Sequence, residues 1–263
     1  MRHLAIILAL LWAPCAVAQD SGLVTLETRD ASKGWEGVGR LDIQGKGFCT
    51  AALIQPRLIL TAAHCLYDDT GALIAPDRFT FEAGLRDGRA AASRRITRML
   101  AHPDYDHRGT NTDASEVASD IGLLELDQPI RNGRIMPYPI AAKPFIGDQI
   151  GIVSYARERA NAASLQKVCS VIGRQDGVIL MSCDIAFGAS GAPVFIMQND
   201  QARIVSVVSA MAEIDGNKIA IGTSLAQPLA QLLTDFASQS TGGARKIITN
   251  GQRSEGGAKF VRP

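Results

Sequence analysis

Short apolar runs, separated by turns rich in glycine, proline, asparagine and aspartate, fill most of this chain. Runs of this length, with many β-branched and aromatic side chains, are typical of strands in a sandwich or barrel. The first set of runs lies at residues 38–43, 48–54, 58–61, 79–83, 95–101 and 121–126. The second set lies at residues 149–155, 165–173, 178–184, 192–197, 204–210 and 219–223. Two successive all-β units, at 35–130 and 149–224, are therefore predicted, with a proline-rich connector at 131–148.

Residues 225–238 have a different period, in which apolar side chains recur at helical spacing. This pattern predicts one packed C-terminal helix, with Ser224 as its cap and Pro228 in its first turn. Residues 239–263 are rich in glycine and basic side chains and contain few core residues. They predict a flexible tail, with a partner-binding segment as the alternative.

The N-terminus has the pattern of an export signal at 1–18. Arg2 precedes an apolar run at 4–13, and the small residues Ala16-Val17-Ala18 predict cleavage after Ala18. The run is too short to span a bilayer, so no membrane span is expected after signal removal; an uncleaved anchor is the alternative. Residues 19–34 are polar and weakly patterned and predict a loose leader or short propeptide, with order beginning near Trp35.

Composition places the chain among ordinary soluble proteins. Of its 263 residues, 46% are hydrophobic and 20% charged, and the formal net charge of +1 falls to zero once Arg2 is removed. A charge this close to zero gives no support to a nucleic-acid or membrane-surface partner. We expect an exported monomer.

Four cysteines remain after Cys15 leaves with the signal, an even number that favours disulfides in an exported protein. Their spacings resemble no zinc motif, and three pairings are formally open. The segments flanking 175–177 are predicted to form a hairpin whose register places Cys169 opposite Cys183, within disulfide reach. Cys49 is then left to pair with Cys65.

The glycine-rich turn at 187–193 carries a single hydroxyl, that of Ser190, and leads into an apolar strand. A serine nucleophile needs a nearby base and donors for the oxyanion, and glycine permits the backbone N–H of Gly188 to turn inward. Taken alone, this heptapeptide is better explained as an ordinary turn between strands.

A base and an acid with suitable surroundings occur earlier in the chain. His64 follows the apolar run at 58–61, among small residues, and Asp120 stands at the entrance of a strongly apolar strand. Each has a structural explanation on its own, as a satisfied histidine or a strand-start turn residue. The other candidates occupy segments expected to be exposed loop: His102, His107, Asp104, Asp106 and Asp113.

Three motifs in the order LTAAHC, SDIGLLEL and GASGAP resemble the chymotrypsin/trypsin family of serine peptidases. The resemblance implies an all-β fold of two packed six-stranded antiparallel β-barrels. It also implies that Ser190 attacks a peptide carbonyl, His64 transfers the proton, Asp120 orients the imidazole, and Gly188 with Ser190 forms the oxyanion hole. Protein or peptide substrates are expected, with no metal and no organic cofactor. Cys49, in a segment that also resembles the family, is placed to pair with Cys65.

The resemblance extends to the specificity pocket. By this resemblance Asp184, six residues before the serine, corresponds to the acid that selects Arg or Lys in trypsin. Bacterial members commonly carry Cys-Asp here without sharing one specificity, so the alternative for Asp184 is a residue that holds the pocket wall by hydrogen bonds. The strand containing Ser209 and Met211 corresponds to the opposite wall. Basic side chains before the scissile bond are the first expectation, and small or apolar ones the next, because Met211 replaces a glycine and narrows the pocket.

Ala189 stands where animal digestive members carry an acid that pairs with the new N-terminus. GASGAP and the opening at Trp35 are more similar to bacterial secreted trypsin-like and glutamyl-endopeptidase-like members, so a periplasmic or secreted bacterial location is expected. Two other functions stay open: a binding or scaffold protein that keeps the protease fold, and a serine esterase.

Overall fold

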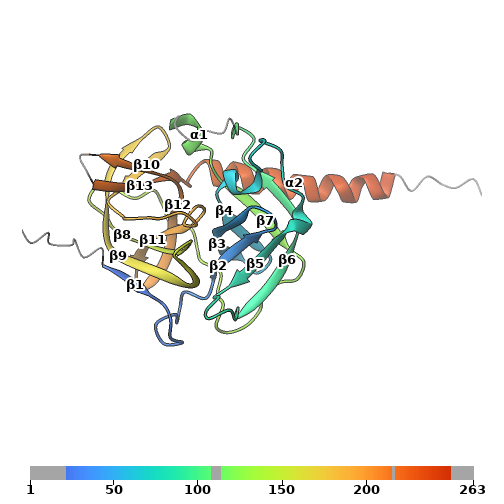
Figure 1. Cartoon of the computed structure of the whole chain (residues 1–263). Helices are drawn as coiled ribbons and strands as arrows, with labels where there is room; N and C mark the ends of the chain where they lie inside the picture. The colour runs from blue at the N-terminus through green and yellow to red at the C-terminus, as the bar shows by residue number, and fades with distance from the viewer. Residues whose placement is uncertain (1–21, 108–113, 215–216, 250–263) are drawn as a thin grey trace, which may run out of the picture.

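Two antiparallel β-barrels lie side by side in the computed structural model, which describes residues 22–107, 114–214 and 217–249 (Figure 1). The N-terminal barrel closes in the order β2-β3-β4-β7-β6-β5. Its strands are β2 (Val38–Ile43), β3 (Gly47–Gln55), β4 (Leu58–Thr61), β5 (Phe79–Ala83), β6 (Ala92–Ala101) and β7 (Gly122–Leu126).

The second sheet has the order β1-β9-β10-β13-β12-β11-β8, and an additional pairing of β8 with β9 closes six of these strands into the C-terminal barrel. Its strands are β8 (Gln149–Ala156), β9 (Arg159–Gln175), β10 (Val178–Met181), β11 (Pro193–Gln198), β12 (Gln201–Ile214) and β13 (Asn217–Ser224), with β1 (Leu23–Thr25) added at the edge of β9. The fold class predicted from the sequence is confirmed.

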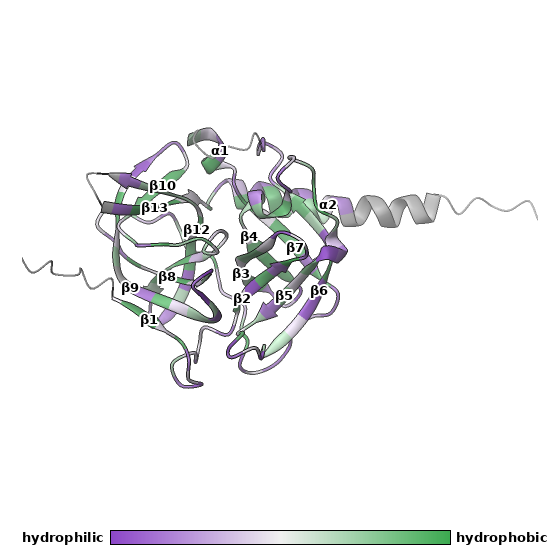
Figure 2. Ribbon diagram, viewed as in Figure 1, coloured by the Kyte–Doolittle hydropathy of each residue, from purple (hydrophilic) through white to green (hydrophobic). Residues whose placement is uncertain are grey.

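The alternation of apolar and polar residues explains which side chains fill the barrels. Along β5, Phe79, Phe81 and Ala83 point inward while their neighbours are partly exposed, as the period of a strand requires. All four residues of β4 are buried, and β3, β4 and β7 are largely green in the hydropathy view (Figure 2). The two barrels meet at an aromatic cluster in which Phe195 of β11 lies 5.1 Å from Trp35 and 4.8 Å from Tyr138, between ring centroids.

Residues before Trp35 are more ordered than the sequence indicates. β1 pairs with β9, and Leu26 is buried while its N–H donates to the carbonyl of Ala163. Residues 23–26 therefore lie against the C-terminal barrel, where the sequence predicts a loose leader. The predicted signal at 1–18 lies outside the described residues.

The C-terminal helix α2 (Pro228–Thr249) begins at the proline predicted for its first turn and continues beyond residue 238, where the sequence predicts a tail. Figure 1 shows it leaving the C-terminal barrel and running along the N-terminal one. Leu229, Leu232 and Phe236 are buried, and the Arg98 guanidinium of β6 lies 3.6 Å from the Phe236 ring centroid.

A short helix, α1 (Ala114–Ala118), precedes β7. Within the described residues, no helix has both the length and the hydropathy needed to cross a membrane.

The turn between β9 and β10 is tighter than the predicted three-residue loop. Gln175 pairs with Val178, so that only Asp176 and Gly177 form the turn, and both have a positive φ. Two-residue hairpins favour this conformation because it matches the twist of the strands.

A bulge restores the register that the cysteines need. The pairing shifts by one residue between Leu180 and Met181, after which Ser182 donates to the carbonyl of Ser170. Cys169 and Cys183 then stand opposite each other and form a disulfide, with their Cα atoms 5.1 Å apart. The second disulfide joins Cys49 to Cys65, so both predicted pairings are confirmed.

His102, predicted in an exposed loop, is buried at the end of β6, and its Nε2 has no hydrogen-bond partner in the described part of the chain. Burial lowers the pKa of its imidazole, and the opposing effects of Asp104 and Asp235 are smaller. A histidine with a lowered pKa in the folded state binds its proton more readily when unfolded, so it stabilises the fold above its unfolded pKa and loses that contribution as the pH falls.

We therefore expect wild-type stability to fall between about pH 7 and pH 5 more steeply than that of His102→Gln, because the unfolded imidazole titrates near 6.5. Urea unfolding at several pH values measures the difference. If the free energy of unfolding fell equally with pH in the two proteins, the buried His102 imidazole would not be the cause of the loss.

Candidate active site

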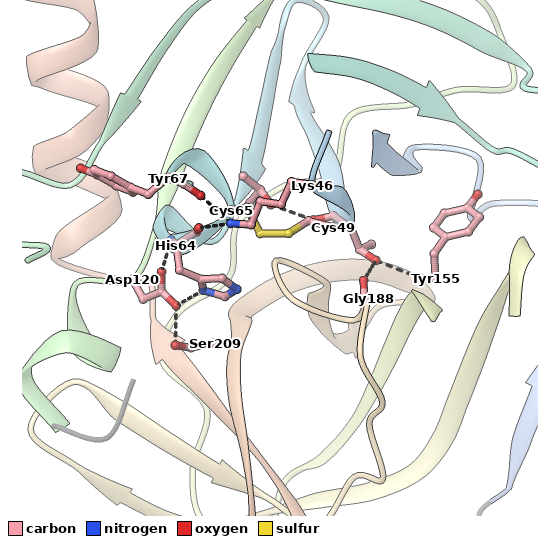
Figure 3. The surroundings of a disulfide bond; sticks show 11 residues. Lys46, Cys49, His64, Cys65, Tyr67, Asp120, Tyr155, Gly188 and Ser209 are labelled. Atoms are coloured by element: carbon pink, nitrogen blue, oxygen red, sulfur yellow. Dashed lines mark hydrogen bonds and ion pairs between the residues drawn. A yellow bond between two sulfur atoms is a disulfide. The ribbon is translucent and has the colours of Figure 1, made fainter. Parts of the chain in front are cut away.

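His64 is held in a short turn at the end of a buried strand. β4 ends at Thr61, and a single 3₁₀ turn over Ala63–Leu66 follows. The disulfide between Cys49 and Cys65 ties this turn to β3 directly beside the histidine (Figure 3). Only 15% of the imidazole is exposed, so the ring has a fixed position with one edge toward solvent.

Asp120 lies beneath the imidazole and is almost completely buried, with 1% of its side chain exposed. Its Oδ2 lies 2.7 Å from His64 Nδ1, and its Oδ1 accepts a hydrogen bond of 2.8 Å from the His64 backbone N–H. Ser209 of β12 donates its hydroxyl to Oδ2 (Figure 3). These donors satisfy the buried carboxylate, and a carboxylate at Nδ1 selects the tautomer that leaves Nε2 as an acceptor.

Ser190 stands on the predicted glycine-rich turn, between two glycines with positive φ. Gly188 has φ +101° and Gly191 has φ +77°. A Cβ atom at Gly191 would lie 2.0 Å from Thr61 Oγ1, and one at Gly188 would lie 2.6 Å from the Phe48 ring. Glycine is therefore required at both positions by conformation and by space.

The peptide planes on either side of Ser190 are fixed by hydrogen bonds to their carbonyls. Arg157 N–H donates to the carbonyl of Phe187 at 2.7 Å, and Ala192 N–H donates to the carbonyl of Ala189 at 2.9 Å. Because N–H and C=O point in opposite directions across a trans peptide, these bonds turn the N–H groups of Gly188 and Ser190 away from the two carbonyls. Gly188 and Ser190 both line the cleft, where their N–H groups can donate hydrogen bonds to an oxyanion.

Thr50, which the sequence did not single out, supports this turn from the other barrel. Its N–H donates to the carbonyl of Ser190 at 2.8 Å, and its hydroxyl donates to the carbonyl of Gly188 at 2.9 Å. The same hydroxyl accepts a hydrogen bond from the Tyr155 N–H. Thr50 lies within a segment that resembles the family, but its role depends on contacts more than 100 residues away in the chain.

Two cavities flank His64 and Ser190. The first, here named the β12-side pocket, has a volume of about 200 Å³. Its lining residues are His64, Ile185, Ala186, Phe187, Ser190, Val208, Ser209, Ala210 and Met211. The second, the β3-side pocket, has a volume of about 370 Å³. Its lining residues are Ile43, Lys46, Gly47, Phe48, Cys49, His64, Arg157, Phe187, Gly188 and Ser190.

The structure thus brings His64 and Ser190 to one cleft between the barrels, with Asp120 buried against the imidazole. His64 and Ser190 share both cavities, although the described residues include no hydrogen bond between His64 Nε2 and Ser190 Oγ. In unliganded enzymes this contact is often long and shortens on substrate binding.

Of the three predicted specificity residues, Ser209 and Met211 line the β12-side pocket and Asp184 does not. Met211 lines the β12-side pocket, whereas Ser209 is buried and bonds Asp120 as well as lining the pocket. Asp184 is absent from the lining, about half exposed, and 3.7 Å from Lys218 Nζ. It is therefore not the buried acid that selection of basic side chains requires.

Cys49, His64 and Cys65 have ligand atoms within 4.8 Å of one another, a spacing compatible with a metal ion. The two sulfurs are bonded to each other, however, and a disulfide offers no thiolate to a metal.

At position 189 the structure has the buried methyl group of Ala189, where an activation ion pair with the N-terminus would need a carboxylate.

Comparison with known proteins agrees with the fold. The glutamyl endopeptidase of Bacillus licheniformis is 25% identical over 155 residues, which cover 57% of this chain and 45% of that protein. The chain thus spans less than half the length of this relative. A solved structure described as Glu endopeptidase in complex with MPD superposes with a TM-score of 0.69 at 19% identity, covering 84% of this chain and 99% of the other. The family model for trypsin matches residues 27–230, well over half of the sequence. The chain therefore belongs to the trypsin family of chymotrypsin-like serine peptidases.

Proposed function

We propose that this protein is a serine endopeptidase that works through Ser190, His64 and Asp120. The observation that carries the proposal is the buried Asp120 carboxylate on His64 Nδ1, in a cleft that the imidazole shares with Ser190. If the carboxylate were only structural, it would do no more than accept hydrogen bonds from His64 and Ser209. In a catalytic account it also stabilises the imidazolium that forms when the serine loses its proton.

The chemistry follows the geometry of the cleft. Ser190 Oγ attacks the carbonyl carbon of the scissile bond as His64 Nε2 takes its proton, and the developing oxyanion accepts hydrogen bonds from the N–H groups of Gly188 and Ser190. The imidazolium then protonates the leaving amine, and the C–N bond breaks to give an acyl-enzyme. Water, deprotonated by the same nitrogen, releases the acid and restores the serine.

We infer that the residue before the scissile bond is small or apolar. The relative's name, glutamyl endopeptidase, implies action at glutamate, and Asp184 in the sequence suggests arginine or lysine. Apart from His64, every residue that lines the β12-side pocket is uncharged. A glutamate or arginine side chain would enter without a compensating charge, and burying an unpaired charge is costly.

Export to an oxidising compartment is part of the proposal. Two disulfides form within the described residues, and such bonds persist in the periplasm and outside the cell. Protein or peptide substrates and a monomeric state are proposed with it.

An esterase would use the same acyl-transfer groups, and a scaffold protein would need none of them. A digest of an unbiased peptide library separates the three. We expect cleavage after small or apolar residues, a pattern unchanged by Asp184→Ser and extended to longer side chains by Met211→Gly. Labelling of Ser190 by a fluorophosphonate without any peptide cleavage would favour an esterase, and absence of both would favour a scaffold. If the wild type favoured Arg or Lys before the cut and Asp184→Ser abolished that preference, Asp184 would be a specificity residue after all.

A further inference from the structure

The β3-side pocket differs from the β12-side pocket in its charge. Two cations line it, Lys46 from the β2–β3 loop and Arg157 from the β8–β9 turn, and no acidic side chain does. The two residues come from different barrels and therefore stand on either side of the cleft. Substrate lying across this pocket passes between them.

Lys46 is anchored beside the catalytic histidine. Its Nζ donates to the carbonyl of His64 at 3.2 Å and to the carbonyl of Tyr67 at 2.5 Å (Figure 3). An ammonium has three donors, so one is left for a ligand. Asp68 and Asp69 influence Lys46 electrostatically, but neither lies within ion-pair distance, and Asp68 accepts hydrogen bonds from Thr70 and Ala72. Partial desolvation of the side chain lowers the pKa of the Lys46 ammonium, although the residue as a whole is exposed.

Arg157 is ordered by different contacts. Its backbone N–H holds the carbonyl of Phe187, and its guanidinium lies 5.4 Å from the Phe187 ring centroid. Among the described residues, the ion pairs include none that involves Arg157. The guanidinium therefore offers its donors to a ligand at the mouth of the pocket.

The position of the pocket determines which part of a substrate it receives. Residues 185–187 and 208–211 line the β12-side pocket, which takes the side chain before the scissile bond under the proposed function. The β3-side pocket lies on the other side of Ser190, next to Gly188. It is the space into which the leaving segment of the peptide extends.

We propose that Lys46 and Arg157 select substrates with Asp or Glu at the first or second position after the scissile bond. The inference rests on the proposed function, because the pocket acts on a peptide held at Ser190. A carboxylate there forms charge-assisted hydrogen bonds with two cations that lack a competing carboxylate in the pocket. Both cations are exposed, so the preference is expected to be modest and sensitive to salt.

The test compares two pairs of internally quenched peptides, each with alanine before the cut and differing only by Glu or Gln at the first or second position after it. For the wild type, kcat/KM is expected to be about 3–10-fold higher for a Glu peptide than for its Gln partner at low salt, and the ratio should approach one at 0.5 M NaCl. In the double variant Lys46→Gln/Arg157→Gln, the ratio of kcat/KM for the Glu peptide to that for the Gln peptide should be close to one at both salt concentrations. The ratio is the readout, because loss of the Lys46 contact to His64 lowers turnover of both peptides equally.

Arg131→Gln and Lys143→Gln are matched controls, since both positions are exposed in the connector and line neither pocket. They should keep the wild-type ratio. Equal kcat/KM for Glu and Gln peptides in the wild type, or a ratio unchanged in the double variant, would overturn the subsite while leaving the peptidase intact. If the wild type hydrolysed none of the four peptides, or if Ser190→Ala hydrolysed them at the wild-type rate, both the proposed function and the subsite would be overturned.

Discussion

Ser190→Ala is expected to reduce kcat for peptide hydrolysis by about a millionfold, because the serine and its base act as a unit and removing either removes the acyl-enzyme route. The Asp120–His64 pair and the two N–H groups of the turn stay in place, so substrate binding should survive. The partly exposed serine side chain contributes little to packing, and the unfolding temperature should change little.

Active-site titration and steady-state kinetics on a peptide from the library digest measure the loss. Ser182→Ala is a suitable control, since Ser182 is an exposed serine of the same barrel that lines neither pocket. A Ser190→Ala protein that cleaves peptides at the wild-type rate would show that another group is the nucleophile.

The barrels could be predicted from the sequence because their signals are local. Strands such as β5 alternate apolar and polar residues, and turns carry glycine where a positive φ is needed. The disulfide between Cys169 and Cys183 was predicted from a three-residue loop, whereas the chain has a two-residue turn and a compensating bulge. The two differences cancel at the cysteines, and nothing in the local sequence marks the bulge.

Order that depends on distant partners could not be predicted in this way. β1 contains three residues and gains its stability from pairing with β9, about 140 residues later in the chain. His102 stands in a polar segment and is nevertheless buried at the end of β6, facing the charge of Asp235 in α2. Polar neighbouring residues indicate a loose segment around β1 and an exposed loop at His102, and in both cases tertiary packing overrides the local signal.

In the candidate site, too, some features could be predicted from local motifs and others depend on distant parts of the chain. The positions of His64, Asp120 and Ser190 follow from short motifs in a fixed order. The exposure of Asp184 and its ion pair with Lys218 depend on where β13 places the lysine, which no local motif indicates. Lys46 and Arg157 line one pocket because loops of two different barrels come together there, and no local sequence signal indicates this.

Asp120→Asn separates the orienting role of the carboxylate from its structural one. The substitution keeps the size of the side chain, and one amide oxygen can still accept from the His64 N–H or from Ser209. The amide nitrogen is a donor, however, so where it faces His64 Nδ1 it selects the tautomer with the proton on Nε2. That nitrogen then cannot take the serine proton, and the imidazolium loses its counter-charge. We expect kcat at neutral pH to fall by about 10⁴-fold, with a folded protein.

The measurement pairs kcat with thermal unfolding of both proteins. Asp176→Asn is the matched control, because the same chemical change there falls in the β9–β10 turn, where asparagine tolerates the positive φ. It should keep both activity and stability. If Asp120→Asn retained more than about a tenth of wild-type kcat, a loss far below that of a triad acid, the buried carboxylate would be a structural partner of His64 and Ser209 with no part in orienting a catalytic base.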